Sequence, residues 1–83
     1  MTEMVGEMAL SQTRVGHTYE LVGLDAGERL RERARSMGLN SGSRFQVIAN
    51  SGRGPVGIYV RRTRLVIGRG MSAKIRVREI EST

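Results

Sequence analysis

The chain has 83 residues, 39% of them hydrophobic, which is enough for one compact domain with a single core and excludes a second lobe. It contains no cysteine, and this excludes a disulfide framework and any thiolate metal site. Thirteen of its fourteen basic residues are Arg, and the net charge of +6 suits either an acidic protein or a nucleic acid as a partner.

Two features argue against membrane insertion or secretion. The apolar runs, such as Leu65-Val66-Ile67, are far shorter than the roughly 20 residues of a membrane span. Residues 1–7 are acidic and lack the basic start and apolar core of a secretory signal, so we expect a cytoplasmic protein. We expect residues 1–9 to form a flexible extension, 10–79 the folded domain, and 80–83 a C-terminal tail.

A strand and a helix are predicted at the start of the domain. The pattern of residues 18–24 predicts the first strand. Asp25 and Glu28 have the spacing of a capping box, which predicts a helix from that point. Gly38 supplies the left-handed position at which helices commonly end.

The predicted helix has one narrow apolar stripe, and its other faces are charged. The stripe spans about 80° of the helix circumference, and we expect its four side chains to be buried: Ala26, Leu30, Ala34 and Met37. On the charged faces the spacing predicts two ion pairs, Glu28 with Arg31 and Glu32 with Arg35.

Short strands with local connections fill the rest of the chain. Residues 44–49 and 56–60 alternate as strands, and the turn-forming residues 50–55 between them predict a hairpin loop. A tight connection, a fourth strand, a glycine break, a 3₁₀ turn and a fifth strand follow in that order, at residues 61–64, 65–67, 68–70, 71–73 and 75–77.

Together these elements predict a mainly β protein. We expect a small closed barrel of about five strands, with one α-helix between the first and second strands that plugs one opening. The predicted core consists of inward-facing aliphatic and aromatic side chains: Leu21, Leu24, Leu30, Phe45, Val47, Ile58, Val60, Leu65, Ile67, Ile75 and Val77. A core of this size leaves little stability to spare for a buried polar site.

The sequence brings no catalytic or metal-binding group together. His17 is the only histidine, and on a strand Glu20 would point to the opposite face from it. Glu28 and Glu32 share a helix face, but the interleaved arginines favour an ion-paired surface over an iron site. We therefore predict no catalytic, cofactor-binding or metal-binding residue, and a protein that is not an enzyme.

Three arginine-containing segments are candidates for phosphate binding. Gly52-Arg53-Gly54 and Gly68-Arg69-Gly70 do not follow a strand and open a long helix, so turn geometry explains their glycines. The run Arg61-Arg62-Thr63-Arg64 could contact a phosphate backbone, which leaves a basic nucleic-acid-binding barrel as an alternative. Aromatic residues for base stacking are scarce, so no nucleic acid is expected.

The order of glycines and aliphatic residues over residues 10–78 resembles the FeoA family. The motifs that carry the resemblance are Met37-Gly38-Leu39 with Gly42, Gly54-Pro55-Val56, Leu65-Val66-Ile67-Gly68, and Ala73-Lys74-Ile75-Arg76-Val77. The resemblance implies an SH3-like domain and a cytosolic accessory protein of bacterial ferrous iron uptake. It also implies a protein partner, the cytosolic domain of the FeoB transporter, and contact with the membrane only through that partner.

On this resemblance we expect a partner-binding surface at the helix C-terminus and the glycine-proline hairpin, formed by Arg35, Met37, Leu39, Gly54 and Pro55. Its expected rim, which would select an acidic partner, consists of Tyr59, Arg61, Arg62 and Arg64. For Met37 and Leu39, plain core packing is the alternative interpretation. A stand-alone SH3-like module related to the C-terminal domains of metalloregulators is the alternative for the whole chain.

Overall fold

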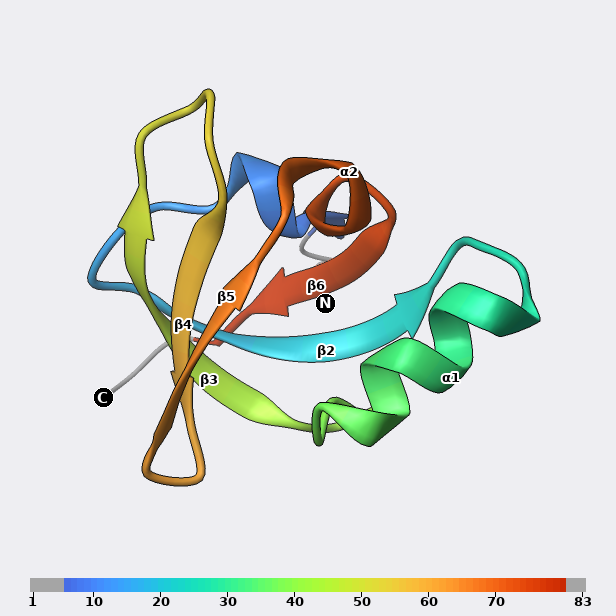
Figure 1. The fold of residues 1–83 in the computed structure, drawn as a ribbon. Coiled ribbons are helices and arrows are strands. Elements are labelled where there is room, and N and C mark those ends of the chain that lie inside the picture. Colours follow the sequence, from blue (N-terminus) through green and yellow to red (C-terminus); the bar gives the residue numbers. More distant parts are fainter. Residues whose placement is uncertain (1–5, 81–83) are drawn as a thin grey trace.

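The computed structural model describes residues 6–80, which form short strands and one longer helix (Figure 1). The elements are, in order, β1 (Met8–Ala9), η1 (Leu10–Gln12), β2 (Thr18–Leu24), α1 (Glu28–Ser36), β3 (Arg44–Asn50), β4 (Val56–Val60), β5 (Thr63–Ile67), α2 (Arg69–Ser72) and β6 (Ile75–Glu79). Within this described range, no helix is long and apolar enough to cross a bilayer.

All strands of residues 6–80 belong to one antiparallel sheet in the order β1-β6-β2-β3-β4-β5. The mainly β prediction is confirmed, and each of the five predicted strands is present. β1 and β5 are the two ends of this order. In Figure 1 the sheet curls strongly, but its two end strands do not pair with each other within residues 6–80, so strand pairing does not close the sheet into the closed barrel that was expected.

The ends of the domain differ from the prediction. Met8 pairs with Val77 and Ala9 with Arg76, so these two residues belong to the sheet and not to a flexible extension. A strand of two residues is too short to show any alternation in the sequence. At the other end, the N–H of Ile80 donates to the carbonyl of Thr18 at 2.9 Å. Of the other residues expected in the two ends, 1–5 and 81–83 lie outside the described part.

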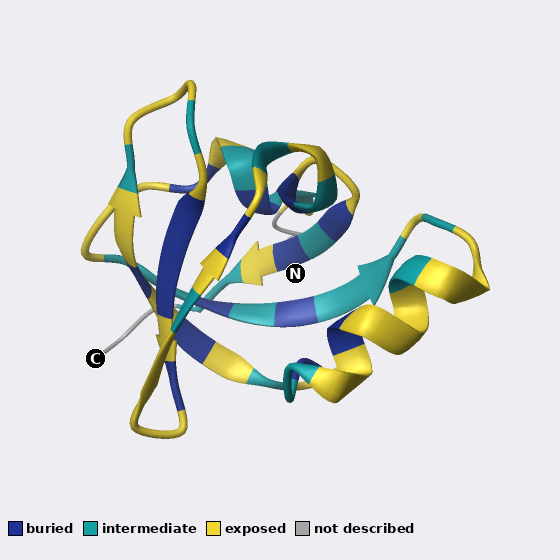
Figure 2. Ribbon diagram, viewed as in Figure 1, coloured by how far each residue is buried: buried dark blue, intermediate teal, exposed yellow. Residues whose placement is uncertain are grey.

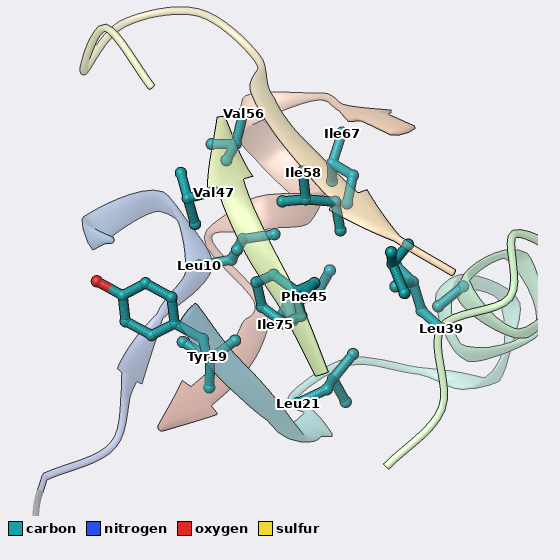
Figure 3. Packing of buried hydrophobic residues seen from close by; sticks show 13 residues of the cluster. Leu10, Tyr19, Leu21, Leu39, Phe45, Val47, Val56, Ile58, Ile67 and Ile75 are labelled. Carbon is teal, nitrogen blue, oxygen red and sulfur yellow. The ribbon is translucent and has the colours of Figure 1, made fainter. Parts of the chain in front are cut away.

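One apolar cluster lies inside the curled sheet (Figure 3). Its buried members are Leu10, Tyr19, Leu21, Ala34, Leu39, Phe45, Val47, Val56, Ile58, Val60, Ile67, Ile75 and Val77. Of the predicted core, Leu24 and Leu65 are only partly buried against this cluster, and Leu30 is half-exposed on α1. The cluster is dominated by strand residues because alternation sends every second side chain inward.

The start of α1 differs from the predicted capping box. Gly27 is the N-cap, and no side chain caps the helix. The N–H of Asp25 instead donates to the carbonyl of Lys74 at 2.8 Å, which continues the pairing of β2 with β6 and delays the helix. At the other end Gly38 has φ +91°, so the predicted left-handed residue after the helix is confirmed.

α1 lies at the edge of the molecule, and most of its surface is exposed (Figure 2). Only Ala34 of the predicted stripe is buried, and the other three side chains are half-exposed. The predicted i,i+3 ion pairs are also wrong, since Arg35 pairs with Glu28 at 3.0 Å, two turns away, and Arg31 donates to the carbonyl of Ala26. The helix therefore covers the sheet through a single small side chain and the residues after its last turn.

Two connections near the C-terminus differ from the prediction. The link between β4 and β5 consists of Arg61 and Arg62 alone, because Val60 pairs directly with Thr63. Thr63 and Arg64, expected in the connection, belong to β5. The turn expected to be 3₁₀ is a single α-helical turn, α2, which already begins at Arg69.

A pair of matched valine substitutions tests the core. We expect Val47→Ala to lower the free energy of unfolding by about 2–3 kcal/mol, because Val47 is fully buried and two methyl groups are lost. Val66 is 70% exposed on β5, so Val66→Ala should change that free energy by less than about 0.5 kcal/mol. Urea denaturation measures both values, and equal losses would contradict the core described above.

Candidate protein-interaction surface

The predicted partner-binding residues lie in three places on the fold. Arg35, Met37 and Leu39 are at the C-terminal end of α1, and Gly54 and Pro55 precede β4. The third group is Tyr59 on β4, the turn residues Arg61 and Arg62, and Arg64 on β5. The structure brings the first and third places to the same end of β3, while the second lies at the other end.

The pairing of β3 with β4 separates the glycine-proline loop from α1. The chain leaves α1 and enters β3 at Arg44, and β3 ends at Asn50, which pairs with Val56. The loop between Asn50 and Val56 is therefore at the far end of this ladder, as Figure 1 shows. Gly54 and Pro55 do not form one surface with the helix C-terminus.

The far loop is held by Arg69, a partly buried residue. Its guanidinium donates to Asn50 Oδ1 at 3.1 Å, to the carbonyl of Gly54 at 3.2 Å and to the carbonyl of Ser11 at 2.9 Å. Asn50 Nδ2 in turn donates to the carbonyls of Ser11 and Thr13. This network ties the loop to the N-terminal segment, so Gly54 has a structural role in the fold.

The three residues at the end of α1 have different environments. Leu39 is only 3% exposed and packs in the core, so the packing interpretation holds for it. Met37 is half-buried against that core. Arg35 is exposed and its guanidinium lies 3.0 Å from the Glu28 carboxylate. Of the three, Met37 and Arg35 retain accessible side-chain surface.

A shallow groove of about 280 Å³ runs between α1 and the end of β5. We call it the α1–β5 groove, and its lining residues are Leu30, Arg33, Met37, Val66, Ile67, Gly68 and Met71. Most of these side chains are apolar. The groove brings Met37 to the C-terminal end of β5, and none of the predicted rim residues is among its lining residues.

The outer sheet face over β3, β4 and β5 carries exposed apolar and basic side chains together. We call these exposed apolar, aromatic and basic side chains the outer hairpin face; they are Arg44, Ile48, Tyr59, Arg64 and Val66. Tyr59 and Arg64 are directly paired across the strands, and Gly57 pairs with Val66. A Cβ at Gly57 would lie 3.5 Å from Cγ1 of Ile48, so the Ile48 side chain lies over this glycine.

The turn between β4 and β5 holds two arginines in an unfavourable backbone conformation. Arg61 has φ +52° and Arg62 has φ +67°, and a two-residue hairpin loop with both φ values positive is a type I′ turn. Asn-Gly is the sequence that such turns prefer, because other residues are strained there. The chain nevertheless presents two arginines at the tip of the hairpin.

Sequence reasoning missed Ile48, Val66 and Met71 as surface residues of this region. The first two follow inward-facing neighbours in their strands, so alternation places them outward and could have identified them. Met71 reaches the groove from α2, and no local pattern predicts that position. The proximity of α1 to β5 is a tertiary feature that short-range patterns do not contain.

His17, the single histidine, directly precedes β2, and its side chain contacts a carboxylate. Its Nδ1 is 2.5 Å from Glu79 Oε2 at the end of β6, and both side chains are about 40% exposed. Glu20, on the other hand, pairs with Arg78 at 3.4 Å. Over residues 6–80, no three or more His, Asp or Glu side chains gather closely enough to hold a metal ion.

The fold and the exposed patch define the class of protein: a small SH3-like β module whose prominent feature is a basic and apolar surface. The chain belongs to the FeoA domain family, whose model matches residues 8–79. That match begins at β1, in agreement with the pairing of Met8 and Ala9.

Similar proteins agree with this family and with the SH3-like fold. A protein of Methanocaldococcus jannaschii with the provisional name Fe(2+) transport protein A is 43% identical over 58 residues, 70% of each chain. The crystal structure of an iron uptake regulatory protein, FeoA, matches with a TM-score of 0.84 and 31% identity, over 90% of this chain and 100% of that one.

A manganese-dependent transcriptional repressor shares the fold alone. It matches with a TM-score of 0.81 and 21% identity, over 89% of this chain but only 37% of the repressor chain. This likeness is one of fold, and it concerns only a part of the repressor chain.

Substitutions of Arg69 test the network at the far loop. We expect Arg69→Ala to lower the free energy of unfolding by about 1–3 kcal/mol, because two carbonyls and one amide oxygen lose a charged donor. The free energy of unfolding of Arg69→Lys should lie between those of the wild type and Arg69→Ala. The control is Arg53→Ala in the same loop, an exposed arginine without a side-chain hydrogen bond among residues 6–80, and it should have little effect. Equal effects of the two alanine variants, measured by urea denaturation, would contradict the network.

The turn residues allow a second test. Replacing Arg61 by Asn and Arg62 by Gly should raise the free energy of unfolding by about 1–2 kcal/mol, because both positive φ values become favourable. The double lysine variant of the same positions keeps both the charge and the strain, and its stability should equal that of the wild type. A thermal or urea unfolding series in which Asn-Gly does not stabilise the protein would contradict the type I′ turn.

Proposed function

We propose that this protein is a cytosolic accessory of ferrous iron uptake and acts by binding the cytosolic domain of the FeoB transporter. Membership of the FeoA family and the name of the relative from M. jannaschii support the iron-uptake part of the proposal. The protein-binding part is supported by the outer hairpin face and the α1–β5 groove. On this proposal the protein is not an enzyme, and it acts by binding its partner through its surface.

The main support for the proposal is a long segment of the chain that has basic but no acidic residues. Residues 33–78 contain eleven Arg and Lys residues and no Asp or Glu. Three of these arginines reach acidic residues from outside the segment, in the pairs Arg35–Glu28, Arg76–Glu7 and Arg78–Glu20. The arginines of the β4–β5 hairpin have no ion-pair partner among residues 6–80. A surface of this kind attracts an acidic protein partner over long range.

Binding of a nucleic acid is less well supported by the same surface. Of the three aromatic residues, Tyr19 and Phe45 are buried and stack on each other with their ring centroids 6.1 Å apart. Only Tyr59, 42% exposed, could stack on a base. Single-stranded nucleic acids are usually held by several such stacking side chains as well as by charge.

Charge-reversal variants test the proposed binding. We expect Arg64→Glu to lower the association rate constant with the soluble domain of FeoB by about tenfold at low salt, because it replaces attraction by repulsion. The difference from the wild type should shrink as salt is raised. Arg53→Glu makes the same charge change in the far loop and should have less than about a twofold effect. Stopped-flow or surface plasmon resonance at several salt concentrations measures both variants.

The wild-type protein provides the decisive measurement. If immobilised FeoB domain retains no wild-type protein at micromolar concentration, the proposed function is contradicted. If it retains the protein but Arg53→Glu and Arg64→Glu weaken association equally, binding occurs without the outer hairpin face.

A further inference from the structure

β5 ends the strand order, and its outer edge carries backbone groups with no partner. The turn Arg61-Arg62 makes Val60 and Thr63 a hydrogen-bonded pair, and antiparallel pairs then alternate between bonded and non-bonded. Arg64 and Val66 fall at non-bonded positions opposite β4, so their N–H and C=O groups point away from the sheet. Within residues 6–80, no backbone hydrogen bond outside the ladders and no side-chain hydrogen bond reaches these groups.

The surroundings of this edge are basic toward the hairpin tip and apolar toward the end of β5. Val66 is 70% exposed, and the α1–β5 groove continues from it to Leu30, Met37 and Met71. Arg64 is exposed on β5, and the turn arginines lie at its start. Natural edge strands are often protected by charge, and arginines here would have that effect against a like-charged strand.

We propose that the outer edge of β5 binds an extended acidic segment of a partner protein, which adds to the sheet as a further strand. Its backbone would pair with the free groups of Arg64 and Val66. Side chains of an added strand alternate between the two faces of the sheet. Those on the outer face would lie beside Arg64 and favour Asp or Glu, and those on the inner face would lie toward the groove and favour apolar residues.

Two other occupants fit the edge less well. A second copy of this chain, paired through its own β5, would place the basic residues Arg61, Arg62 and Arg64 of both copies along one seam, and like charges facing each other across strands repel. A helix would fill the groove but would leave the edge N–H and C=O groups unpaired, because its own backbone groups are already bonded. An extended acidic segment pairs its carboxylates with the arginines and also forms hydrogen bonds with the edge N–H and C=O groups of β5.

This inference rests on the proposed function only in assuming a protein partner, and its test needs no transporter. The probe is the synthetic peptide acetyl-Glu-Val-Glu-Val-Glu-Val-amide, added to the ¹⁵N-labelled protein. We expect amide hydrogen exchange at Arg64 and Val66 to slow by about tenfold or more at saturating peptide, since each N–H gains an acceptor. The lysine counterpart acetyl-Lys-Val-Lys-Val-Lys-Val-amide should not bind.

Backbone-modified peptides separate strand addition from simple charge attraction. Two versions of the acidic peptide, one N-methylated at the glutamates and one at the valines, carry equal charge. Only one set of peptide N–H groups faces β5, so one version should lose at least about tenfold in affinity and the other should bind nearly as well as the parent. Equal binding of the two versions would overturn the proposal, as would equal protection of Arg64 and Val66 by a poly(dT) oligonucleotide.

A variant of the protein completes the test. Val66→Pro removes the outward N–H and leaves the bonds to β4 intact, and proline is tolerated on edge strands in this orientation. Val66→Pro should lower the affinity for the acidic peptide about tenfold, whereas Val66→Ile should bind the peptide as tightly as the wild type does. If the wild-type amides of Arg64 and Val66 show neither protection nor shift at millimolar peptide, the proposal is wrong whatever the FeoB experiment gives.

Discussion

The structure depends on one constraint: a single curled sheet must enclose the only core that a chain of this length can form. Most of the buried side chains come from the inward positions of the strands, and Val47, Val56, Ile58 and Val77 are completely inaccessible. No second layer covers the opposite face of β3, β4 and β5 in the described part of the chain. The exposed outer hairpin face is therefore a consequence of how the core is built. α1 covers one end of the sheet only, and it contributes Ala34 from within the helix.

The two ends of the β3–β4 ladder have different roles because their polar groups are used differently. At the far end, Arg69 donates hydrogen bonds to Asn50, Gly54 and Ser11. These bonds hold the loop against the N-terminal segment. At the near end, Arg61 and Arg62 lie at the hairpin tip, and their guanidinium groups have no such bonds to other residues of the range 6–80. An arginine whose donors are satisfied inside the protein holds the fold together. An arginine with free donors can bind another molecule.

The sequence predicted the strands well, because alternation is a local signal that the sheet obeys at residues 18–24, 44–50 and 56–60. It misplaced the helix start, since the bond from the Asp25 N–H to the Lys74 carbonyl joins residues far apart in the chain. The same limit applies to the candidate surface. Tyr59 and Arg64 were expected at a rim, but only the sheet order reveals that β5 is an edge. The grouping of Met37 with Val66 likewise requires the tertiary packing of α1.

The backbone conformation of the hairpin tip lowers the stability of the fold. Asn-Gly would relieve two positive φ values at Arg61 and Arg62, and a small domain with a modest core would gain noticeably from it. Arginines held in an unfavourable conformation, next to an unpaired strand edge and within a segment of 46 residues without an acidic side chain, have no evident structural purpose. Residues that weaken the fold locally are expected at functional sites, where binding repays the cost. For this reason, which is independent of family membership, we propose the β4–β5 hairpin as the part of the surface that meets a partner.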